Sequence, residues 1–595
     1  MTTAVSPPAS QYPDAISPFS SSDLSENLWI ASTTVQVEAA GAGASFAELP
    51  ANFYVRSLNG PLSEVGPVLP SPLKATRFAR DYFDFRGASS SNLSRVLFSM
   101  KEEHWPGDTT ALGDESLYEY VGTGNQEPLL VGVSGGEGST HLISKCGTSL
   151  AGAGEITATR YGVSEDGNKV LFVPAVCGSS PAVSEIYARV DNGLADAHTV
   201  SVSEPSGEDC SVCDVAKGVR QNAVAVGMSR DGSRVLFLTS QQLLGGDSSN
   251  NLYEYDFARE PGQRIVRVSG GDSTVSNPTA GVESVVNLSP DGSHVYFYAS
   301  GVLTRTPDAL GQEAQVGQSN LYLYERDAQY PDGRTVFVLP HVDVSGVSYV
   351  SQNGRFVVFG SAAHLTPDDL SSVAQEFEYD SVTGGVVRVS VGQDGYNQNG
   401  NTGSVRNAMV ADDGAVYFES ENPLVPQAVN GVANVYEYRE GNLALISDGQ
   451  DTHSGSSSGG GFLDYISPSG TDVFFTTYDR LVARDTDDQE DLYDARVGGG
   501  FVEQVSPPPC EGDSCQGPLA RAPVLLSPGS EFQAGGENLV PSITESSTVA
   551  KSKPKPKPKP KPRHKARKRR RGTASGRKRE GAGVSGRVSR GGGRS

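Results

Sequence analysis

The chain has 595 residues, a formal net charge of -22 and a hydrophobic content of 37%. The charge is divided unevenly. Residues 551–595 carry 19 Lys and Arg side chains and one acidic residue, Glu580. The preceding 550 residues contain 29 basic and 69 acidic residues, a net charge of -40. No run approaches the roughly 18 apolar residues that a membrane-spanning helix needs, so the composition excludes a helical membrane protein.

The clearest feature along the chain is a unit of about sixty residues that recurs from end to end. Its mark is a Val-x-Phe triplet, and the phenylalanines of six successive copies are 65, 60, 62, 59 and 57 residues apart. These copies are Val170-Leu171-Phe172, Val235-Leu236-Phe237, Val295-Tyr296-Phe297, Val357-Val358-Phe359, Val416-Tyr417-Phe418 and Val473-Phe474-Phe475. An earlier copy, Val96-Leu97-Phe98, lies 74 residues upstream of Phe172. A fixed period of this size is typical of repeat architectures.

Each unit contains four predicted strands, which we name a to d. A turn such as Ser289-Pro290-Asp291-Gly292 precedes the triplet, and Gly at positive φ favours a tight hairpin between strands a and b. The triplet itself is strand b. Strand c alternates aromatic residues, as in Leu252-Tyr253-Glu254-Tyr255, and strand d is β-branched, as in Arg264-Ile265-Val266-Arg267-Val268. Alternation with a period of two predicts strands, and no segment shows comparable helical periodicity.

A single small sheet cannot bury both of its faces, whereas sheets stacked radially can. We therefore predict an all-β chain that forms a single β-propeller of four-stranded antiparallel blades. A fainter copy over residues 15–18, 28–31 and 53–55 precedes the others. Counting it gives eight blades, which we favour; seven remain if it is only an appended set of strands. A β-helix is the main alternative, but its repeats are much shorter and the Asp-Gly hairpins require antiparallel pairing.

The units resemble the WD-repeat-like propeller repeats of the TolB type, whose pattern runs Ser-Pro-Asp-Gly, an apolar strand ending in Phe, and an Ile/Leu-Tyr strand. Ser289-Pro290-Asp291-Gly292 through Phe297, followed by Leu321-Tyr322, fits that pattern. The resemblance covers roughly residues 14 to 506. The chain has no Trp-Asp dipeptide and nothing like the α/β domain that precedes the propeller in TolB itself, so the resemblance implies a fold and no Tol-system role.

Composition divides the chain into four parts. We predict a flexible N-terminus over residues 1–13, the propeller over 14–506, a Pro/Gly/Ser-rich linker over 507–550 and a disordered Lys-Pro/Arg-rich tail over 551–595. The tail suits a polyanionic surface or polymer, such as an anionic envelope polymer or phospholipid headgroups, and a purely solvated tether is the alternative. Nucleic acid is the less favoured partner, because a nuclear role conflicts with the disulfides predicted next.

The six cysteines lie in predicted loops or strand ends, and four of them form two tight local pairs. Their even number favours disulfides and an extracytoplasmic or cell-surface location. Fifteen pairings exist for six cysteines; we expect Cys146–Cys177, Cys210–Cys213 and Cys510–Cys515. The first residues show neither a charged nor an apolar signal region. The two observations agree if the natural start lies upstream and carries the export signal.

One acidic segment invites comparison with a calcium loop. Carboxylates cluster over residues 485–491, and Asp485, Asp487 and Asp491 are the weak candidate ligands. An EF-hand needs Gly at the sixth position and Glu at the twelfth, where this chain has Glu490 and Arg496. We therefore expect no cofactor, with an irregular calcium site as the alternative to a solvated acidic loop.

Strand order locates the candidate binding surface. The a–b turns are short, so the long b–c loops and the d–a connections meet on the opposite rim, where binding residues usually lie on a rigid scaffold. The candidate rim residues are the loop aspartates Asp108, Asp247, Asp308, Asp368, Asp369, Asp485 and Asp487.

Two classes of function agree with these observations. The first is a non-catalytic binding or scaffold propeller of the cell envelope or extracellular space, which holds a protein or polysaccharide ligand on this rim. The second is a propeller enzyme, a hydrolase or lyase with a site in the axial funnel, either with or without calcium. We favour binding, and we assign no catalytic residue.

Overall fold

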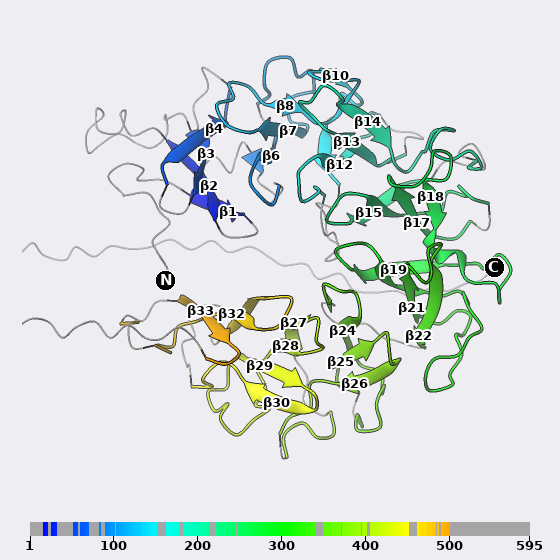
Figure 1. Ribbon diagram of the computed structural model, residues 1–595, viewed down its shortest axis with the longest axis vertical. Coiled ribbons are helices and arrows are strands. Elements are labelled where there is room, and N and C mark those ends of the chain that lie inside the picture. Colours follow the sequence, from blue (N-terminus) through cyan, green and yellow to red (C-terminus); the bar gives the residue numbers. More distant parts are fainter. Residues whose placement is uncertain are drawn as a thin grey trace, which may run out of the picture. The chain divides into compact units, whose positions relative to one another are not determined.

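The structure is a computed structural model of the chain (Figure 1). It divides into two units, residues 1–503 and 504–595. The described residues all belong to the first unit, and they are 16–21, 25–32, 51–57, 60–70, 83–84, 90–101, 103–151, 162–178, 183–214, 221–245, 248–340, 349–370, 372–393, 395–400, 405–450, 461–482, 485–486 and 490–499. The predicted linker, the basic tail and the d strand expected near residues 501–505 lie outside them.

The described residues form successive antiparallel sheets, whose strands pair in the order a-b-c-d. The a strands are β1 (Ile16–Ser20), β5 (Phe83–Asp84), β11 (Thr148–Leu150), β15 (Ala223–Met228), β19 (Val282–Leu288), β23 (Tyr349–Val350), β27 (Val405–Val410) and β31 (Phe462–Ile466). The b strands are β2 (Glu26–Ser32), β6 (Arg95–Met100), β12 (Lys169–Pro174), β16 (Arg234–Thr239), β20 (His294–Ala299), β24 (Phe356–Ser361), β28 (Val416–Ser420) and β32 (Asp472–Thr477).

The outer strands complete each sheet. The c strands are β3 (Ala51–Ser57), β7 (Ser116–Val121), β13 (Tyr187–Val190), β17 (Asn251–Asp256), β21 (Asn320–Glu325), β25 (Gln375–Asp380), β29 (Asn434–Arg439) and β33 (Asp491–Arg496). The d strands are β4 (Leu62–Pro67), β8 (Leu129–Leu130), β14 (His198–Ser201), β18 (Ile265–Arg267), β22 (Arg334–Leu339), β26 (Gly385–Arg388) and β30 (Asn442–Leu445). A two-stranded sheet, β9 (Val133–Ser134) with β10 (His141–Leu142), and a 3-10 turn, η3 (Val268–Gly270), lie between them.

The repeated aromatic residues hold strands b and c together. In seven successive sheets the Phe of strand b lies directly opposite an aromatic residue of strand c, as in the pair Phe297 and Tyr322. These seven pairs have centroid distances between 5.5 and 6.1 Å and are Phe98–Tyr118, Phe172–Tyr187, Phe237–Tyr253, Phe297–Tyr322, Phe359–Phe377, Phe418–Tyr436 and Phe475–Tyr493. Stacked aromatic pairs contribute about 0.5–1.5 kcal/mol each beyond their buried area, which explains why the period is visible in the sequence.

The a–b turns also repeat in atomic detail. In one copy, Ser289 Oγ donates to Asp291 Oδ1 at 2.6 Å, the Ser293 amide donates to the same oxygen at 2.9 Å, and Gly292 adopts a φ of +65°. Turns of neighbouring sheets are joined by backbone hydrogen bonds, such as Glu165 N to Arg230 O at 2.7 Å. A turn that the sequence pattern did not reveal precedes β6, where Leu93 takes the positive φ of +54°.

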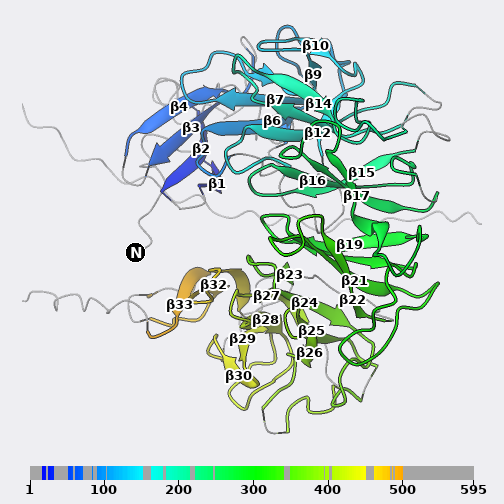
Figure 2. The same cartoon turned by 45° about the vertical axis from the view of Figure 1, so that its right-hand side comes forward.

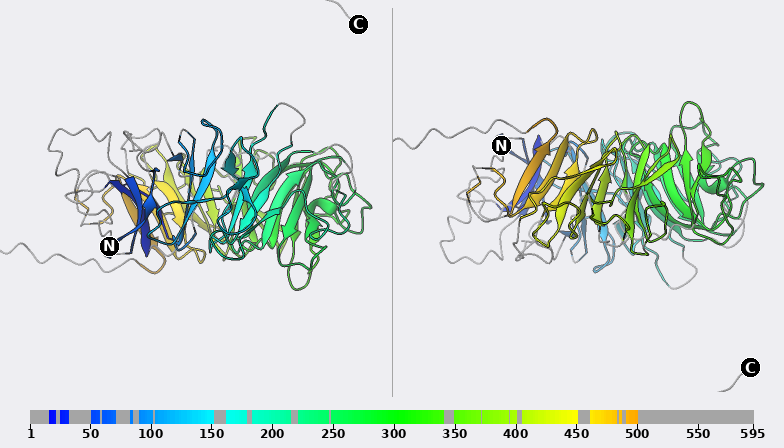
Figure 3. Two further views of the ribbon diagram at one scale, coloured as in Figure 1. Left: turned by 90° about the horizontal axis from the view of Figure 1, so that it is seen from above. Right: turned by 90° about the horizontal axis from the view of Figure 1, so that it is seen from below.

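Each sheet shares its core with the next one along the chain, and Figures 2 and 3 show the sheets following one another. Leu97 of β6 packs in one cluster with Phe172 of β12, and Tyr417 of β28 packs with Phe475 of β32. Four-stranded antiparallel sheets that pack face to face in succession are the architecture of a β-propeller, so the prediction of an all-β propeller is confirmed. Within the described residues no helix is long and apolar enough to cross a bilayer.

The first and last sheets bear on the number of blades. β1 to β4 form a complete four-stranded sheet, and β31 to β33 form a three-stranded one. Counting both, eight sheets of three or four strands follow one another in the described parts of the chain. A closed ring of eight blades stays a prediction.

Candidate binding rim

The long b–c loops lie against the d–a connections, as the strand order predicts. The Leu370 amide in a b–c loop donates to Asn399 O in the following d–a connection at 3.1 Å, and the Val429 amide donates likewise to Gly449 O at 3.0 Å. We call this surface, formed by the b–c loops and the d–a connections, the long-loop rim. The a–b and c–d turns form the opposite surface, which we call the hairpin rim.

Tyrosine hydroxyls of strand c anchor the b–c loops. Tyr322 Oη donates to Gly301 O at 2.8 Å and accepts from the Leu303 amide at 3.2 Å. The equivalent hydroxyl of Tyr436 contacts Asn422 O at 3.1 Å and the Leu424 amide at 3.3 Å. Because each hydroxyl holds two backbone groups of a loop, these loops are fixed to the sheet rather than merely connected to it.

Two of the predicted rim aspartates, Asp308 and Asp368, hold loop structure together, and a third, Asp369, is buried. Asp308 accepts from the amides of Leu310 and Gln312 at 2.9 and 2.8 Å. Asp368 is bound by the buried guanidinium of Arg388 at 2.7 Å, and Asp369 is only 2% exposed. The carboxylates of Asp308 and Asp368 therefore stabilise the loops themselves, a role that the sequence alone did not distinguish from ligand binding.

A fourth aspartate shows the same role most clearly. Asp108 accepts from Tyr118 Oη at 2.5 Å and from the Thr110 amide at 2.8 Å. Burial opposes ionisation of this carboxyl, but hydrogen bonds led by that of Tyr118 outweigh it and lower its pKa. Asp247 and Asp487 lie outside the described residues.

Two of the three candidate calcium ligands, Asp485 and Asp491, lie in the described residues. Asp485 accepts a hydrogen bond from Tyr493 Oη, and Asp491 is exposed at the start of β33. In the described ranges no group of three or more His, Cys, Asp or Glu side chains is placed to hold a metal ion.

Exposed aliphatic side chains gather on the b–c loops. Of the large apolar residues that are exposed in the described parts, eight lie in these loops, and they come from six different sheets. They are Leu112, Val176, Leu310, Val316, Leu370, Val373, Val429 and Val482. Single exposed apolar residues are ordinary, but their recurrence on one rim is a feature that the search for charged residues missed.

Among the described residues two disulfides are present, Cys146–Cys177 and Cys210–Cys213, and they match two of the three expected pairings. Cys146–Cys177 joins the connection before β11 to the b–c loop after β12, so it staples the long-loop rim at this sheet. Beside it lies an open cavity of about 480 Å³, lined mostly by apolar residues and by the charged side chains of Lys145, Glu185 and Glu204.

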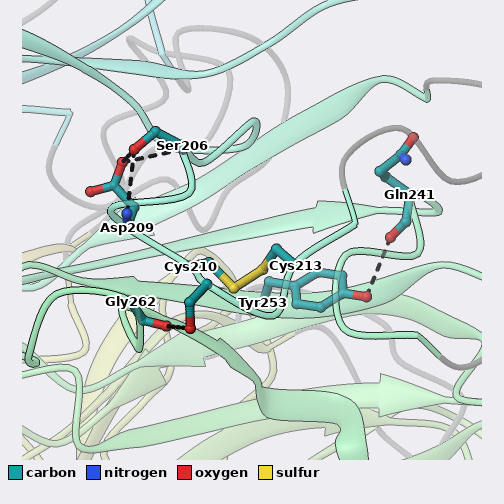
Figure 4. The surroundings of a disulfide bond; sticks show 8 residues. Ser206, Asp209, Cys210, Cys213, Gln241, Tyr253 and Gly262 are labelled. Carbon is teal, nitrogen blue, oxygen red and sulfur yellow. Dashed lines mark hydrogen bonds between the residues drawn. A yellow bond between two sulfur atoms is a disulfide. The ribbon is translucent and has the colours of Figure 1, made fainter.

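The Cys210–Cys213 bridge has a different setting (Figure 4). Cys210 is 3% exposed, and its turn is held by a hydrogen bond from the Ser211 amide to Gly262 O at 3.0 Å. Asp209, which precedes it, accepts from Tyr255 Oη at 2.6 Å. The bridge therefore belongs to a packed turn, in agreement with a structural rather than a redox role. Cys510 and Cys515 lie outside the described residues.

A second cavity, of about 380 Å³, lies on the hairpin rim, which the sequence reasoning set aside. It is formed between the sheet of β23–β26 and the sheet of β27–β30, and Glu378 of β25 lines it. The sequence feature that could have indicated this cavity is the acidic residue between two aromatic residues of strand c, as in Phe377-Glu378-Tyr379.

No model of a known protein family matches the chain, and no curated protein matches it. Among solved structures the chain is similar to a putative TolB from Agrobacterium tumefaciens, at 18% identity and a TM-score of 0.24, over 46% of this chain and 77% of that one. It is also similar to TolB from Acinetobacter baumannii (12% identity, TM-score 0.23, 61% of this chain and 75% of that one).

A third similarity is to prolyl oligopeptidase B from Galerina marginata (12% identity, TM-score 0.34), where the match covers 67% of this chain but only 47% of the other. At such identities no activity follows from these likenesses. The assignment of the chain to the β-propeller fold follows from its sheets and the cores they share.

Proposed function

We propose that this chain is a non-catalytic binding or scaffold protein that holds a protein partner on the long-loop rim. The observation that carries the proposal is the set of eight exposed aliphatic side chains on the b–c loops of six sheets. Apolar residues on anchored loops bury area on contact with little loss of loop entropy, because the tyrosine hydroxyls already restrain those loops.

The side-chain chemistry favours a protein over a polysaccharide. The exposed residues are Leu and Val, which match the apolar core of a protein–protein interface. The charged residues around the 480 Å³ cavity beside Cys146–Cys177 would supply polar contacts at the edge of that interface.

We place the protein in the cell envelope or extracellular space. Disulfides persist in oxidising compartments and are rare in the cytosol, and two are present among the described residues. The basic residues 551–595 supply an attachment to anionic polymers or headgroups there.

Four aspartate substitutions test the rim: Leu112→Asp, Leu310→Asp, Leu370→Asp and Val429→Asp in one variant. Leu194→Asp with Val382→Asp is the matched control, since both residues are exposed but lie in c–d turns of the hairpin rim. Affinity capture from envelope extract should recover a protein with the wild type and the control and lose it with the rim variant. Equal capture by all three chains would refute the rim, and turnover of a peptide or polysaccharide substrate by the wild type would favour the enzyme alternative.

A separate experiment tests the attachment through residues 551–595. Deleting them should abolish binding to anionic polymer beads, and wild-type binding should weaken as salt rises, because exposed charges are screened over about 10 Å at 0.1 M. Undiminished binding by the shortened chain would show that the tail is not the anchor.

A further inference from the structure

The cavity on the hairpin rim is lined by residues of two neighbouring sheets. Glu378, in the middle of β25, lines it. Phe356 of β24 and Tyr438 of β29 are aromatic walls from two neighbouring sheets. Gly414, in the turn between β27 and β28, covers Glu378 so closely that an added Cβ would lie 3.2 Å from Glu378 Oε1. The volume of about 380 Å³ is in the range of small-ligand sites.

Glu378 is buried in this cavity without a bonding partner. Its side chain is 8% exposed, and it makes no hydrogen bond or ion pair with any described residue. A buried carboxyl normally has such partners, since an unsatisfied one costs about 1–3 kcal/mol or more. Two buried glutamates at the equivalent position of strand c do have a cation beside them: Glu119 contacts Arg95 at 3.0 Å, and Glu254 contacts Arg326 at 2.7 Å.

The remaining ions around the cavity are already matched. Arg355 donates to both carboxylate oxygens of Asp380, at 2.7 and 2.8 Å, and Arg439 pairs with Asp413. Glu440, at the edge of the cavity, is exposed and carries a further negative charge. After this pairing the unbalanced charges that face the cavity are negative.

We propose that this cavity binds an organic cation, an alkylammonium or alkylguanidinium group, with Glu378 as its counter-ion and the rings of Phe356 and Tyr438 as its walls. Such a group supplies the missing hydrogen-bond donors to Glu378 in a desolvated setting. The Phe356 ring already has the Arg355 guanidinium over it, 4.6 Å from its centroid, so the aromatic attraction for a further cation falls to Tyr438. The source of the group is either a free amine or a basic residue of a peptide.

Binding of this kind depends on pH. Burial, reinforced by Asp380 and Asp413 and opposed by Arg355, raises the pKa of Glu378 to about 7. The other charged or titratable groups facing it are Tyr438, Arg439 and Glu440. Alkylammonium ions stay protonated up to a pKa of about 10, so only Glu378 titrates near neutrality. Affinity should therefore rise about tenfold from about pH 6 to about pH 8 and then level off.

The test is calorimetric titration of the full chain with butylammonium chloride and with acetyl-Gly-Lys-Gly amide. Butanol and the norleucine peptide are uncharged controls. We expect saturable binding at about pH 8 within about 10 mM of either cation. Glu378→Gln should weaken it tenfold or more, about the value of a charge-assisted hydrogen bond, whereas Glu260→Gln, an exposed carboxylate of another sheet, should not.

The outcomes identify the source of the cation or overturn the proposal. Comparable affinity for both cations assigns the site to free amines, and binding of the peptide alone assigns it to basic peptides. No saturable binding, equal binding by Glu378→Gln, or equal binding of the uncharged controls would overturn the proposal and leave Glu378 as a protonated buried acid. Circular dichroism of the variant establishes that it is folded before the comparison is made.

Discussion

Tyr118 Oη donates a hydrogen bond of 2.5 Å to the carboxylate of Asp108, ten residues earlier in the chain. The same hydroxyl accepts from the Trp105 amide at 3.3 Å, so one side chain of strand c holds the b–c loop at two points. Since Phe98 stacks on the Tyr118 ring at 5.5 Å, the core that forms the sheet also restrains the rim.

Tyr118→Phe should loosen this loop without unfolding the sheet. The ring and its stacking remain, while loss of the hydroxyl removes about 1 kcal/mol of hydrogen bonding. The pKa of Asp108, now lowered, should rise, because Tyr118 is the leading hydrogen-bond donor to it. Hydrogen exchange measures the effect, and the Thr110 amide should exchange faster in the variant. Phe359→Leu is the control, because it alters the core of another sheet, where Phe359 stacks on Phe377. It should leave exchange at the Thr110 amide unchanged.

Removing one partner of the Arg95–Glu119 pair should be strongly destabilising. The side chains are 4% and 0% exposed, and Arg95 also donates to Asn192 O in the next sheet at 2.9 Å. Arg95→Met leaves Glu119 buried without its cation, at a cost of about 3–5 kcal/mol. The double variant Arg95→Met/Glu119→Leu should recover much of that loss in chemical denaturation. A double variant as unstable as the sum of the single ones would contradict a coupled pair.

The two disulfides should stabilise the fold unequally. Their cysteines are 31 and 3 residues apart in sequence, and the longer loop removes more entropy from the unfolded chain. Chain-entropy arithmetic gives about 4 kcal/mol for Cys146–Cys177 and about 2 kcal/mol for Cys210–Cys213. Thermal melts of the two Cys→Ser double variants should rank in that order, and the reverse order would show that native packing of the buried Cys210 outweighs loop entropy.

Gly414→Ala should cost more than Gly441→Ala. Both glycines have positive φ, +85° and +83°, so both variants carry a similar backbone penalty of about 1 kcal/mol. At Gly414 the added Cβ would also lie 3.0 Å from the Phe356 ring, whereas nothing lies within 4 Å at Gly441. The difference between their melting temperatures measures the effect of the contact between the added Cβ and Phe356. Equal decreases in melting temperature would mean that the turn at Gly414 shifts to relieve this contact.

Stability should depend on pH through Glu378. Its pKa is raised from 4.5 to about 7 in the folded state. The folded state therefore keeps the proton that the unfolded state loses, and stability falls as pH rises from about 4.5 through 7, by up to about 3 kcal/mol. Glu378→Gln should remove this decline. Above pH 7 the free energy of unfolding of the variant should therefore rise relative to that of the wild type. A parallel pH dependence of both chains in urea denaturation would exclude Glu378 as the titrating group.

Much of the architecture could be predicted from the chain alone. The Val-x-Phe triplets and the Leu-Tyr strands are visible because each sheet needs the same cross-strand aromatic pair, such as Phe418 and Tyr436 at 5.7 Å. The turn before β6 was missed because its critical position holds Leu93 instead of Gly. Leu93 is 3% exposed in the core, and that burial offsets the cost of a positive φ.

The site was less accessible to sequence reasoning. The sequence pattern predicts that aspartates such as Asp108 and Asp368 bind a ligand. In the structure they bond instead to Tyr118 and Arg388 and stabilise the loops. No local pattern shows which donor a loop carboxylate will meet, since Arg388 lies 20 residues from Asp368.

The repeat by itself determined the all-β class, the strand order and the rim that carries the long loops, because local alternation and turn chemistry are enough to define a blade. Only the tertiary structure decided which carboxyls pair and which stay unpaired. Glu119 and Glu378 occupy the same place in strand c, but Glu119 meets Arg95, while Glu378 faces a cavity covered by Gly414 of the next sheet. Arg95 and Glu119 pair within one sheet, on β6 and β7, whereas the cover over Glu378 comes from the next sheet. The period of the sequence does not show which of these two environments a glutamate of strand c will have.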